Sequence, residues 1–198
     1  MFTLQNAIIP MPQHIEDKEF EISIKSCDVS GCDKEVIEKK LSGFGVFTDE
    51  TGYKISIKTD KTDKRFKNAG KKEGYIIDVH KDKAEVIGYD EAGTYYGAVS
   101  LGKLFHREGD SVLLPGCFIS DYPYFGTRGH FMECRYGSDF MTFDDWKNGI
   151  DYLSEMKINT LTIGIYGCWK RQYDGIFAEY LYTPISKYPC LKTPREGI

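Results

Sequence analysis

Charged side chains close a short apolar run near the middle of the chain, where they could form a binding or reactive site. The run RGHFMECR, residues 128–135, begins at Arg128 and ends with Glu133 and Arg135. A guanidinium offers several fixed hydrogen-bond donors, and a carboxylate beside it supplies acceptors. Glu133 and Arg135 could act together in a site, or they could form an ordinary ion pair of little energetic value.

Two aromatic residues come where a second apolar run ends: Tyr166 is near the end of NTLTIGIYG, residues 159–167, and Trp169 follows it by two residues. Their flat apolar faces could stack on a pyranose ring, and packing into a core is the alternative. The sequence contains no HExxH and no paired CxxC spacing. It therefore predicts no metal site, and it implies no cofactor.

A strand, a helix and a second strand are predicted to position these residues. The stretch TFDDWKNGIDYLSEMKI, residues 142–158, repeats apolar residues at helical spacing. Thr142, followed three residues later by Asp145, is close to the pattern of a capping box. A helix of this length between two apolar strands is typical of a βαβ unit, whose two strands are parallel.

The preceding residues alternate between strand-like and helix-like patterns. Period-two alternation predicts strands over residues 19–27, 53–59, 75–80 and 84–89, and a short strand is predicted within 111–123. Helical spacing predicts helices over 32–45, ending at Gly43 or Gly45, and from Asp90, a suitable N-cap, onward. This order predicts an α+β domain at residues 1–122, with helices on one face of a small, mainly antiparallel sheet.

Composition excludes several classes of protein. The chain has 198 residues, is 41% hydrophobic and carries a formal charge of -4. This acidic balance argues against nucleic acid, which requires a concentrated basic surface. One basic run, residues 58–72, is interpreted as a solvated loop. No segment approaches the ~18 apolar residues that a membrane span needs, so no membrane partner is predicted.

The N-terminal residues and the cysteines bear on the cellular compartment. MFTLQNAIIPMPQHIED lacks the basic start and continuous apolar core of a secretory signal. A cytoplasmic protein is therefore expected, unless a signal has been removed. Six cysteines are scattered along the chain, which favours reduced, mostly buried thiols over a disulfide framework.

Three stretches, in order along the chain, resemble glycoside hydrolase family 20, the β-N-acetylhexosaminidases. Residues 73–105 are similar to the accessory domain that precedes the barrel in that family. LPGCFISDYPYFGTRG, residues 114–129, resembles the family pattern "lP...I.DyP.f..RG", and DYLSEMKINTLTI, residues 151–163, resembles "iD.ma..KlN.lh.H". The resemblance covers roughly residues 70 to 165.

The resemblance implies a zincin-like accessory domain at residues 1–122, followed at 123–198 by the first strands of a (β/α)8 barrel, which typically needs about 250 residues. It implies retaining hydrolysis of terminal sugars of N-acetylhexosamine-containing glycans, with the substrate's own acetamido group as nucleophile. The family's catalytic Asp–Glu pair follows a later barrel strand, beyond Ile198. The chain by itself is therefore expected to hold no catalytic residue and to be inactive.

The resemblance also implies one substrate-binding residue, and position along the strands adds others. Arg128 matches the family arginine that holds hydroxyls of the terminal sugar, and a structural tie between the two domains is the alternative. Because active sites of such barrels lie at the carboxyl ends of the strands, Glu133, Arg135, Tyr166 and Trp169 are also predicted to bind the substrate.

Two departures from the family pattern keep a second function open. The family's "H.H..D" after its second strand is replaced here by Thr162, Gly164 and Tyr166. Arg135 arrives one residue earlier than the second family arginine, and ECRYG, residues 133–137, resembles the "EGFYG" of family 84 enzymes. A non-catalytic carbohydrate-binding or scaffolding module is therefore the alternative. The oligomeric state is left open.

Overall fold

The computed structural model describes residues 3–133 and 141–164. Its contacts divide the chain into two units, Met1–Gly126 with Glu155–Lys157, and Thr127–Ser154 with Ile158–Ile198. Among the described helices, none has the length and apolar character needed to cross a membrane. The expected domain boundary between residues 122 and 123 stays a prediction.

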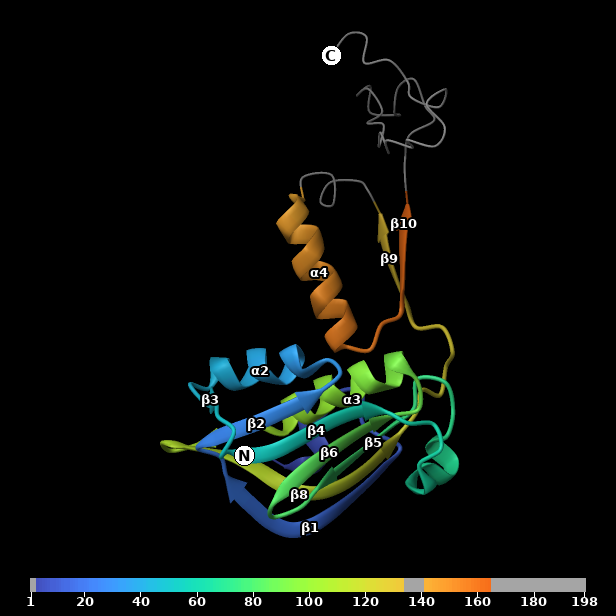
Figure 1. Ribbon diagram of the computed structural model, residues 1–198. Coiled ribbons are helices and arrows are strands. Elements are labelled where there is room, and N and C mark those ends of the chain that lie inside the picture. Colours follow the sequence, from blue (N-terminus) through green and yellow to red (C-terminus); the bar gives the residue numbers. More distant parts are fainter. Residues whose placement is uncertain (1–2, 134–140, 165–198) are drawn as a thin grey trace, which may run out of the picture. The chain divides into compact units, whose positions relative to one another are not determined.

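The first unit is built on one mixed sheet (Figure 1). Its strands run in the order β1-β8-β5-β6-β4-β2-β3, and β7 pairs with β8. The strands are β1 His14–Ser23, β2 Ser26–Gly31, β3 Phe47–Thr48, β4 Tyr53–Thr59, β5 Tyr75–Val79, β6 Lys83–Gly88, β7 His106–Glu108 and β8 Ser111–Asp121. The helices are α1 Leu4–Ala7, α2 Lys34–Gly43, the 3-10 helix η1 Lys64–Ala69 and α3 Glu91–Leu104.

The expectation of a mainly antiparallel sheet is wrong for one half of it. Strands β1, β8, β5 and β6 pair antiparallel, whereas β6 with β4, β4 with β2 and β2 with β3 are parallel. The reason is the connection between β2 and β4, which passes through α2, because a helical crossover returns the chain in the same direction. Short turns join the strands of two antiparallel hairpins, β5–β6 and β7–β8.

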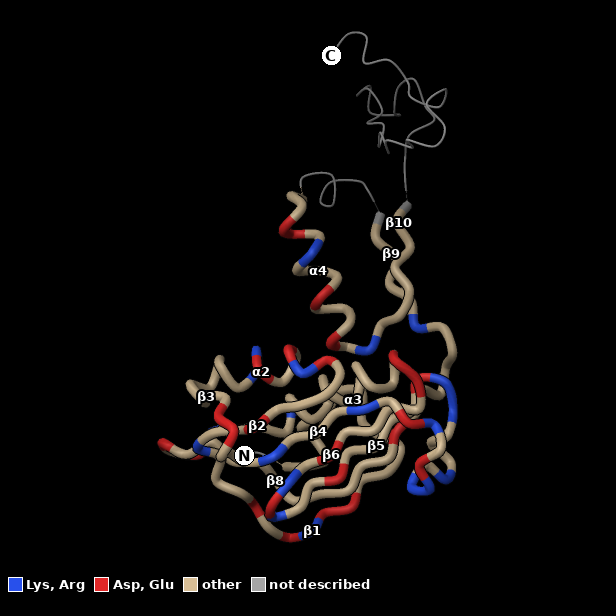
Figure 2. Tube along the Cα trace, viewed as in Figure 1, with Lys and Arg blue, Asp and Glu red and all other residues tan. Residues whose placement is uncertain are grey.

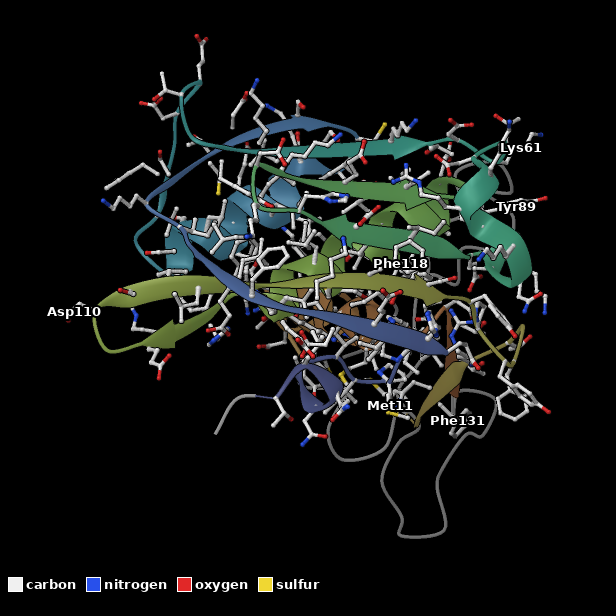
Figure 3. All side chains as sticks on the ribbon, turned by 90° about the horizontal axis from the view of Figure 1, so that it is seen from below. Met11, Lys61, Tyr89, Asp110, Phe118 and Phe131 are labelled. Carbon is white, nitrogen blue, oxygen red and sulfur yellow. The ribbon has the colours of Figure 1, made fainter. Side chains whose placement is uncertain are left out.

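Helices α2 and α3 cover the same face of this sheet, as expected (Figure 1). The core between them contains fully buried side chains from α2, α3 and the inward face of the strands, among them Ile37, Leu101, Ile57 and Ile77. The opposite face of the sheet carries a smaller cluster in which Phe66 of η1 packs on Ile76 and Ile87. Tyr89 and Phe118 lie beside this cluster, on the face seen in Figure 3.

Helix α3 begins where glycines allow the helix to pack closely against the sheet. Its predicted N-cap is confirmed, because the Asp90 carboxylate accepts from the Gly93 N–H at 2.8 Å. A Cβ at Gly93 would lie 2.1 Å from the carbonyl oxygen of Gly74, and a Cβ at Gly88 would lie 2.1 Å from Thr94 Oγ1. Glycine is therefore required where the helix start meets the sheet.

The single strand predicted over residues 19–27 is divided into β1 and β2. Among the described strands β1 pairs with β8 alone, and it contains a bulge, because its register shifts between Asp17 and Glu21. Three residues of β1 there oppose Gly116 alone, and the Phe20 ring fills the space that a Cβ on Gly116 would need. The chain then turns at residues 24–25 and enters the parallel half of the sheet. Alternation continues across this turn, so it did not reveal the break.

The second unit contains a βαβ arrangement, as predicted. Strands β9 Gly129–Glu133 and β10 Thr160–Gly164 are parallel and in register, and α4 Phe143–Glu155 lies between them in the chain. The near capping box forms: Thr142 Oγ1 donates to the Asp145 carboxylate at 2.7 Å, and the Asp145 N–H donates back to Thr142 Oγ1. The Asp145 carboxylate accepts from both Thr142 Oγ1 and the Thr142 backbone N–H, and these two hydrogen bonds lower the pKa of Asp145.

Of the three cysteines that the structure describes, Cys27 and Cys117 are buried and Cys32 is exposed. All three are free thiols. Burial raises the pKa of both Cys27 and Cys117 to about 12, so both thiols stay protonated and inert at neutral pH. The expectation of reduced, mostly buried cysteines is confirmed for these two residues.

Candidate functional site

The carboxyl edge of β9 and β10 is the candidate site. The two strands are paired from Gly129 with Thr160 to Glu133 with Gly164, so they end at the same edge. The chain leaves both strands from this edge, as in parallel α/β sheets whose ligands bind beyond the carboxyl ends of the strands. Of the predicted substrate-binding residues, Glu133 ends β9 at this edge. Arg135, Tyr166 and Trp169 lie outside the described residues.

Arg128 lies at the opposite edge of the same strand pair. Its backbone N–H donates to Asn159 Oδ1 at 2.9 Å, and its carbonyl oxygen accepts from the N–H groups of Asn159 and Thr160. Arg128 and Glu133 are five positions apart along an extended strand, which corresponds to about 16 Å. The structure therefore does not bring the Arg128 and Glu133 backbones together at one end of the strands.

Asn159 has a role that sequence reasoning missed. Its side-chain oxygen accepts from Arg128, and its own N–H returns a hydrogen bond to the Arg128 carbonyl. Asn159 thereby aligns the starts of β9 and β10. The sequence signal for this role is the asparagine of KIN, residues 157–159, which directly precedes β10.

Strand β10 carries small and apolar residues where the resemblance would place histidines. Thr162 is exposed and pairs with Phe131 of β9. Phe131 and Ile163 are also exposed among the described residues of these strands. The described part of β10 thus offers a hydroxyl and apolar surface, without the imidazole groups of the family pattern.

A buried polar cluster in the first unit was not predicted. The Tyr75 hydroxyl lies 2.7 Å from Asp121 Oδ2 and 2.8 Å from Ser100 Oγ, and Lys157 Nζ lies 2.7 Å from the same hydroxyl. Lys157 also forms an ion pair with Asp121 at 3.0 Å. We call Tyr75, Ser100, Asp121 and Lys157 the buried tetrad.

Electrostatics fix the hydrogen-bond directions in the buried tetrad. Burial, with the negative charge of Asp121, raises the pKa of Tyr75 well above its ordinary value, so the phenol keeps its proton. Tyr75 therefore donates to Asp121 and accepts from Ser100 and from Lys157. Each polar group has a partner, which is the condition under which buried polar atoms are tolerated. The polar groups of the tetrad are satisfied by one another, so we assign the tetrad a structural role.

A second polar cluster surrounds Arg65, on the face of the sheet opposite α3. Arg65 forms ion pairs with Asp63, Asp78 and Glu85 at 3.0–3.1 Å. Lys18 binds the other oxygen of Asp78 at 2.6 Å, and His80 Nε2 lies 3.0 Å from the same oxygen. Asp78, His80 and Glu85 are close enough to share a metal ion. Arg65 and Lys18 already neutralise these carboxylates, so we interpret the cluster as an ion-pair network.

The Arg65 network is expected to lose its stabilising effect in acid. The hydrogen bond from Arg65 lowers the pKa of Asp63. Burial would raise the pKa of Asp78, but the hydrogen bond and charge of Lys18, with His80 and Arg65, leave it lowered. The unfolded-state pKa of an aspartate is about 3.9. Stability from these depressed carboxyls is therefore complete above about pH 4 and is lost as the pH falls through their folded-state values.

We expect Arg65→Met to reduce the free energy of unfolding at pH 7 and to reduce it less at pH 3. Urea unfolding at a series of pH values measures both. The exposed Lys54, changed to Met, is the matched control and should leave the slope with pH unchanged. A difference between wild type and Arg65→Met that stays constant from pH 7 to pH 3 would contradict the assignment of these pKa shifts.

Residues 5–122 match the family described as "Glycosyl hydrolase family 20, domain 2". A curated relative, a beta-hexosaminidase of Porphyromonas gingivalis, is 37% identical over 97 residues, which cover 45% of this chain and 12% of the relative.

Two solved structures share the fold. A glycoside hydrolase family 20 β-N-acetylglucosaminidase has a TM-score of 0.66 and 24% identity, over 81% of this chain and 30% of that one. The β-N-acetylhexosaminidase of Bacteroides fragilis has a TM-score of 0.62 and 23% identity, over 82% of this chain and 34% of that one. The chain therefore spans about a third or less of the length of each of these three proteins.

Proposed function

The chain belongs to glycosyl hydrolase family 20, and from this membership we propose that it forms part of a longer glycoside hydrolase that removes terminal N-acetylhexosamine from glycans. The observation that carries the proposal is the match over residues 5–122, followed in the chain by a parallel βαβ unit. The names of the relatives, a beta-hexosaminidase and a β-N-acetylglucosaminidase, support N-acetylhexosamine as the sugar that is removed.

In this proposal the first unit is a zincin-like accessory domain, and β9, α4 and β10 begin a (β/α)8 barrel. The parallel pairing of β9 and β10 supports a barrel, because such a pair needs further strands and helices to cover it. Helix α4 supports it as well. None of the described residues of α4 is buried, and apolar side chains such as Phe143 and Tyr152 remain exposed.

The proposed reaction is retaining hydrolysis in which the acetamido group of the substrate attacks its own anomeric carbon. The Asp–Glu pair that orients this group and protonates the leaving oxygen would come from residues beyond Ile198. The chain would contribute Glu133, Arg135, Tyr166 and Trp169 at the carboxyl edge of the strands. The resemblance gives Arg128 the sugar hydroxyls to hold, whereas its place at the opposite edge of the strands favours the structural tie, so the test below includes this residue.

The test compares hydrolysis of p-nitrophenyl N-acetylglucosaminide by this 198-residue chain and by a protein in which the chain continues into further barrel strands. We expect hydrolysis by the longer protein only. We also expect Arg128→Ala in the longer protein to lower kcat/KM about 10- to 100-fold, because hydrogen bonds to a charged group are worth about 1.5–3 kcal/mol.

Two controls make this test specific. The p-nitrophenyl glucoside lacks the acetamido group, so substrate-assisted chemistry should leave it intact. Arg107 is an exposed arginine of the first unit that donates to the Phe44 carbonyl, and Arg107→Ala should leave kcat/KM unchanged. Equal hydrolysis of both substrates would overturn the mechanism. If Arg128→Ala lowers stability while kcat/KM stays the same, the structural-tie alternative is correct.

The second candidate function is a non-catalytic carbohydrate-binding or scaffolding module. The observation in its favour is strand β10, where Thr162 and Gly164 occupy the positions of the family's histidines. Absence of hydrolysis by the longer protein, together with binding of N-acetylglucosamine, would favour the binding module over the enzyme.

A further inference from the structure

The residues 58–72, which we call the basic loop, carry a charge opposite to that of the rest of the chain. This segment contains seven Lys or Arg residues and two Asp residues, for a net charge of +5, whereas the whole chain carries -4. The remaining residues therefore carry -9. Figure 2 shows blue segments gathered around η1, beside a sheet with many red segments.

Inward-facing residues fix the shape of the basic loop. Phe66 and Ala69 are buried against Ile76 and Ile87 on the face of the sheet opposite α3. Asp63 caps η1 by accepting from the Arg65 N–H, and the Arg65 guanidinium is held by three carboxylates. The loop is therefore an ordered platform, and its remaining basic side chains are free to face the solvent.

The outward-facing charges of the basic loop are not neutralised by neighbours. Lys58 forms an exposed pair with Asp60 at 3.2 Å. The other five lysines are exposed, and none has an Asp or Glu oxygen within 4.0 Å in the part of the chain that the structure describes. These five are Lys61, Lys64, Lys67, Lys71 and Lys72. Such a group of like charges raises the local concentration of anions.

Aromatic side chains border these lysines. Lys71 Nζ lies 4.0 Å from the centre of the Tyr122 ring, which packs on the same small apolar cluster as Phe66. Two residues further along the chain, Tyr124 is 80% exposed. Lys61 and Tyr89 also lie together at this end of the sheet (Figure 3). They border a shallow pocket whose lining also includes Asp60, Asp90 and Glu91, so the anionic ligand would lie over the lysines and outside this pocket. The exposed ring of Tyr124 could stack on the apolar face of a sugar whose edge carries an anionic group.

We propose that the basic loop, with Tyr122 and Tyr124, binds an anionic polysaccharide that carries carboxylate or sulfate groups. Lysine ammonium groups bind anions as point charges, which suits isolated carboxylates and sulfates. The one arginine of the loop, the residue type best suited to phosphate, is occupied by three carboxylates. The strongly acidic remainder of the chain would repel a long, stiff polyanion such as duplex DNA. This inference does not depend on the proposed hydrolase activity.

The test measures binding of a fluorescent heparin decasaccharide at about 20 mM salt, where surface charges are weakly screened. We expect the variant Lys61→Glu/Lys64→Glu/Lys72→Glu to bind at least tenfold more weakly than wild type. It leaves Lys71 on the Tyr122 ring and Lys67, whose backbone has a φ of 40°, unchanged. Because the three lysines are exposed, the thermal unfolding midpoint should stay near that of wild type. Tyr124→Ala should also weaken binding.

The matched control is Lys25→Glu/Lys39→Glu/Lys54→Glu, which changes the net charge equally at three exposed lysines outside the loop. We expect this control to bind like wild type apart from a small nonspecific loss. No binding at 20 mM salt, or an equal loss in both triple variants, would overturn the proposal. Tighter binding of single-stranded DNA of equal charge, or equal binding of a neutral chitin oligosaccharide, would also overturn it.

Discussion

Asp121→Ala is expected to lower the free energy of unfolding by about 3–5 kcal/mol, the usual cost of removing one partner from a buried ion pair. The change would leave the Lys157 ammonium buried without a counter-ion, and the Tyr75 hydroxyl would lose the acceptor to which it donates at 2.7 Å. Both charged side chains of the pair are at most 10% exposed, so water cannot replace the lost contacts without local opening.

A double-mutant cycle with Lys157→Met measures the coupling within this pair. The double variant should be less destabilised than the sum of the two single variants, because it leaves no unpaired buried charge. Glu38 forms a partly exposed i,i+4 pair with Lys34 at 3.5 Å and provides the control. Glu38→Ala should cost less than about 1 kcal/mol. An equally small cost for Asp121→Ala would contradict the role assigned to the buried tetrad.

Gly93→Ala is expected to destabilise the chain by about 1–3 kcal/mol or more, the range for added atoms in a packed interior. The same change normally stabilises a helix by roughly 1 kcal/mol, because alanine loses less backbone entropy than glycine. Here the new Cβ would lie 2.1 Å from the carbonyl oxygen of Gly74, and a backbone atom cannot rotate away. The steric cost therefore outweighs the helix propensity.

Gly102→Ala is the matched control, in the same helix. A Cβ at Gly102 would meet its nearest neighbour, Lys40 Cγ, at 3.6 Å, which is an ordinary contact. Gly102→Ala should therefore stabilise the chain by about 0.5–1 kcal/mol. Urea unfolding of the two variants should give changes of opposite sign. If both variants are more stable than wild type, the close approach of α3 to residue 74 is incorrect.

Local features of the fold could be predicted from the sequence, because they depend on neighbouring residues. Alternation predicted β4 and the β5–β6 hairpin, and the glycines at the end of the 32–45 segment predicted where α2 stops. Asp90 and Thr142 were identified as helix starts for the same reason. The order of strands in the sheet was not predicted, because pairing such as that of β8 between β1 and β5 joins residues far apart in sequence.

The same distinction between local and long-range features applies to the polar residues described above. That Glu133 ends a strand follows from the local pattern of polar and apolar residues. That Lys157 reaches Asp121, 36 residues away, does not, because an isolated lysine beside a helix end gives no sign that it is buried. Likewise, the basic composition of residues 58–72 indicated a solvated loop, whereas the inward contacts of Arg65 and Phe66 that order it depend on strands β5 and β6.

The bulge in β1 has a consequence for how copies of this chain meet. In the main sheet β1 is an outer strand, and an outer strand with a regular, uninterrupted backbone can pair with the same strand of another molecule and start aggregation. The register shift between Asp17 and Glu21 breaks that regularity. The charged sequence EDKEFE, residues 16–21, surrounds the break. Strand β1 thereby protects the sheet against intermolecular strand addition.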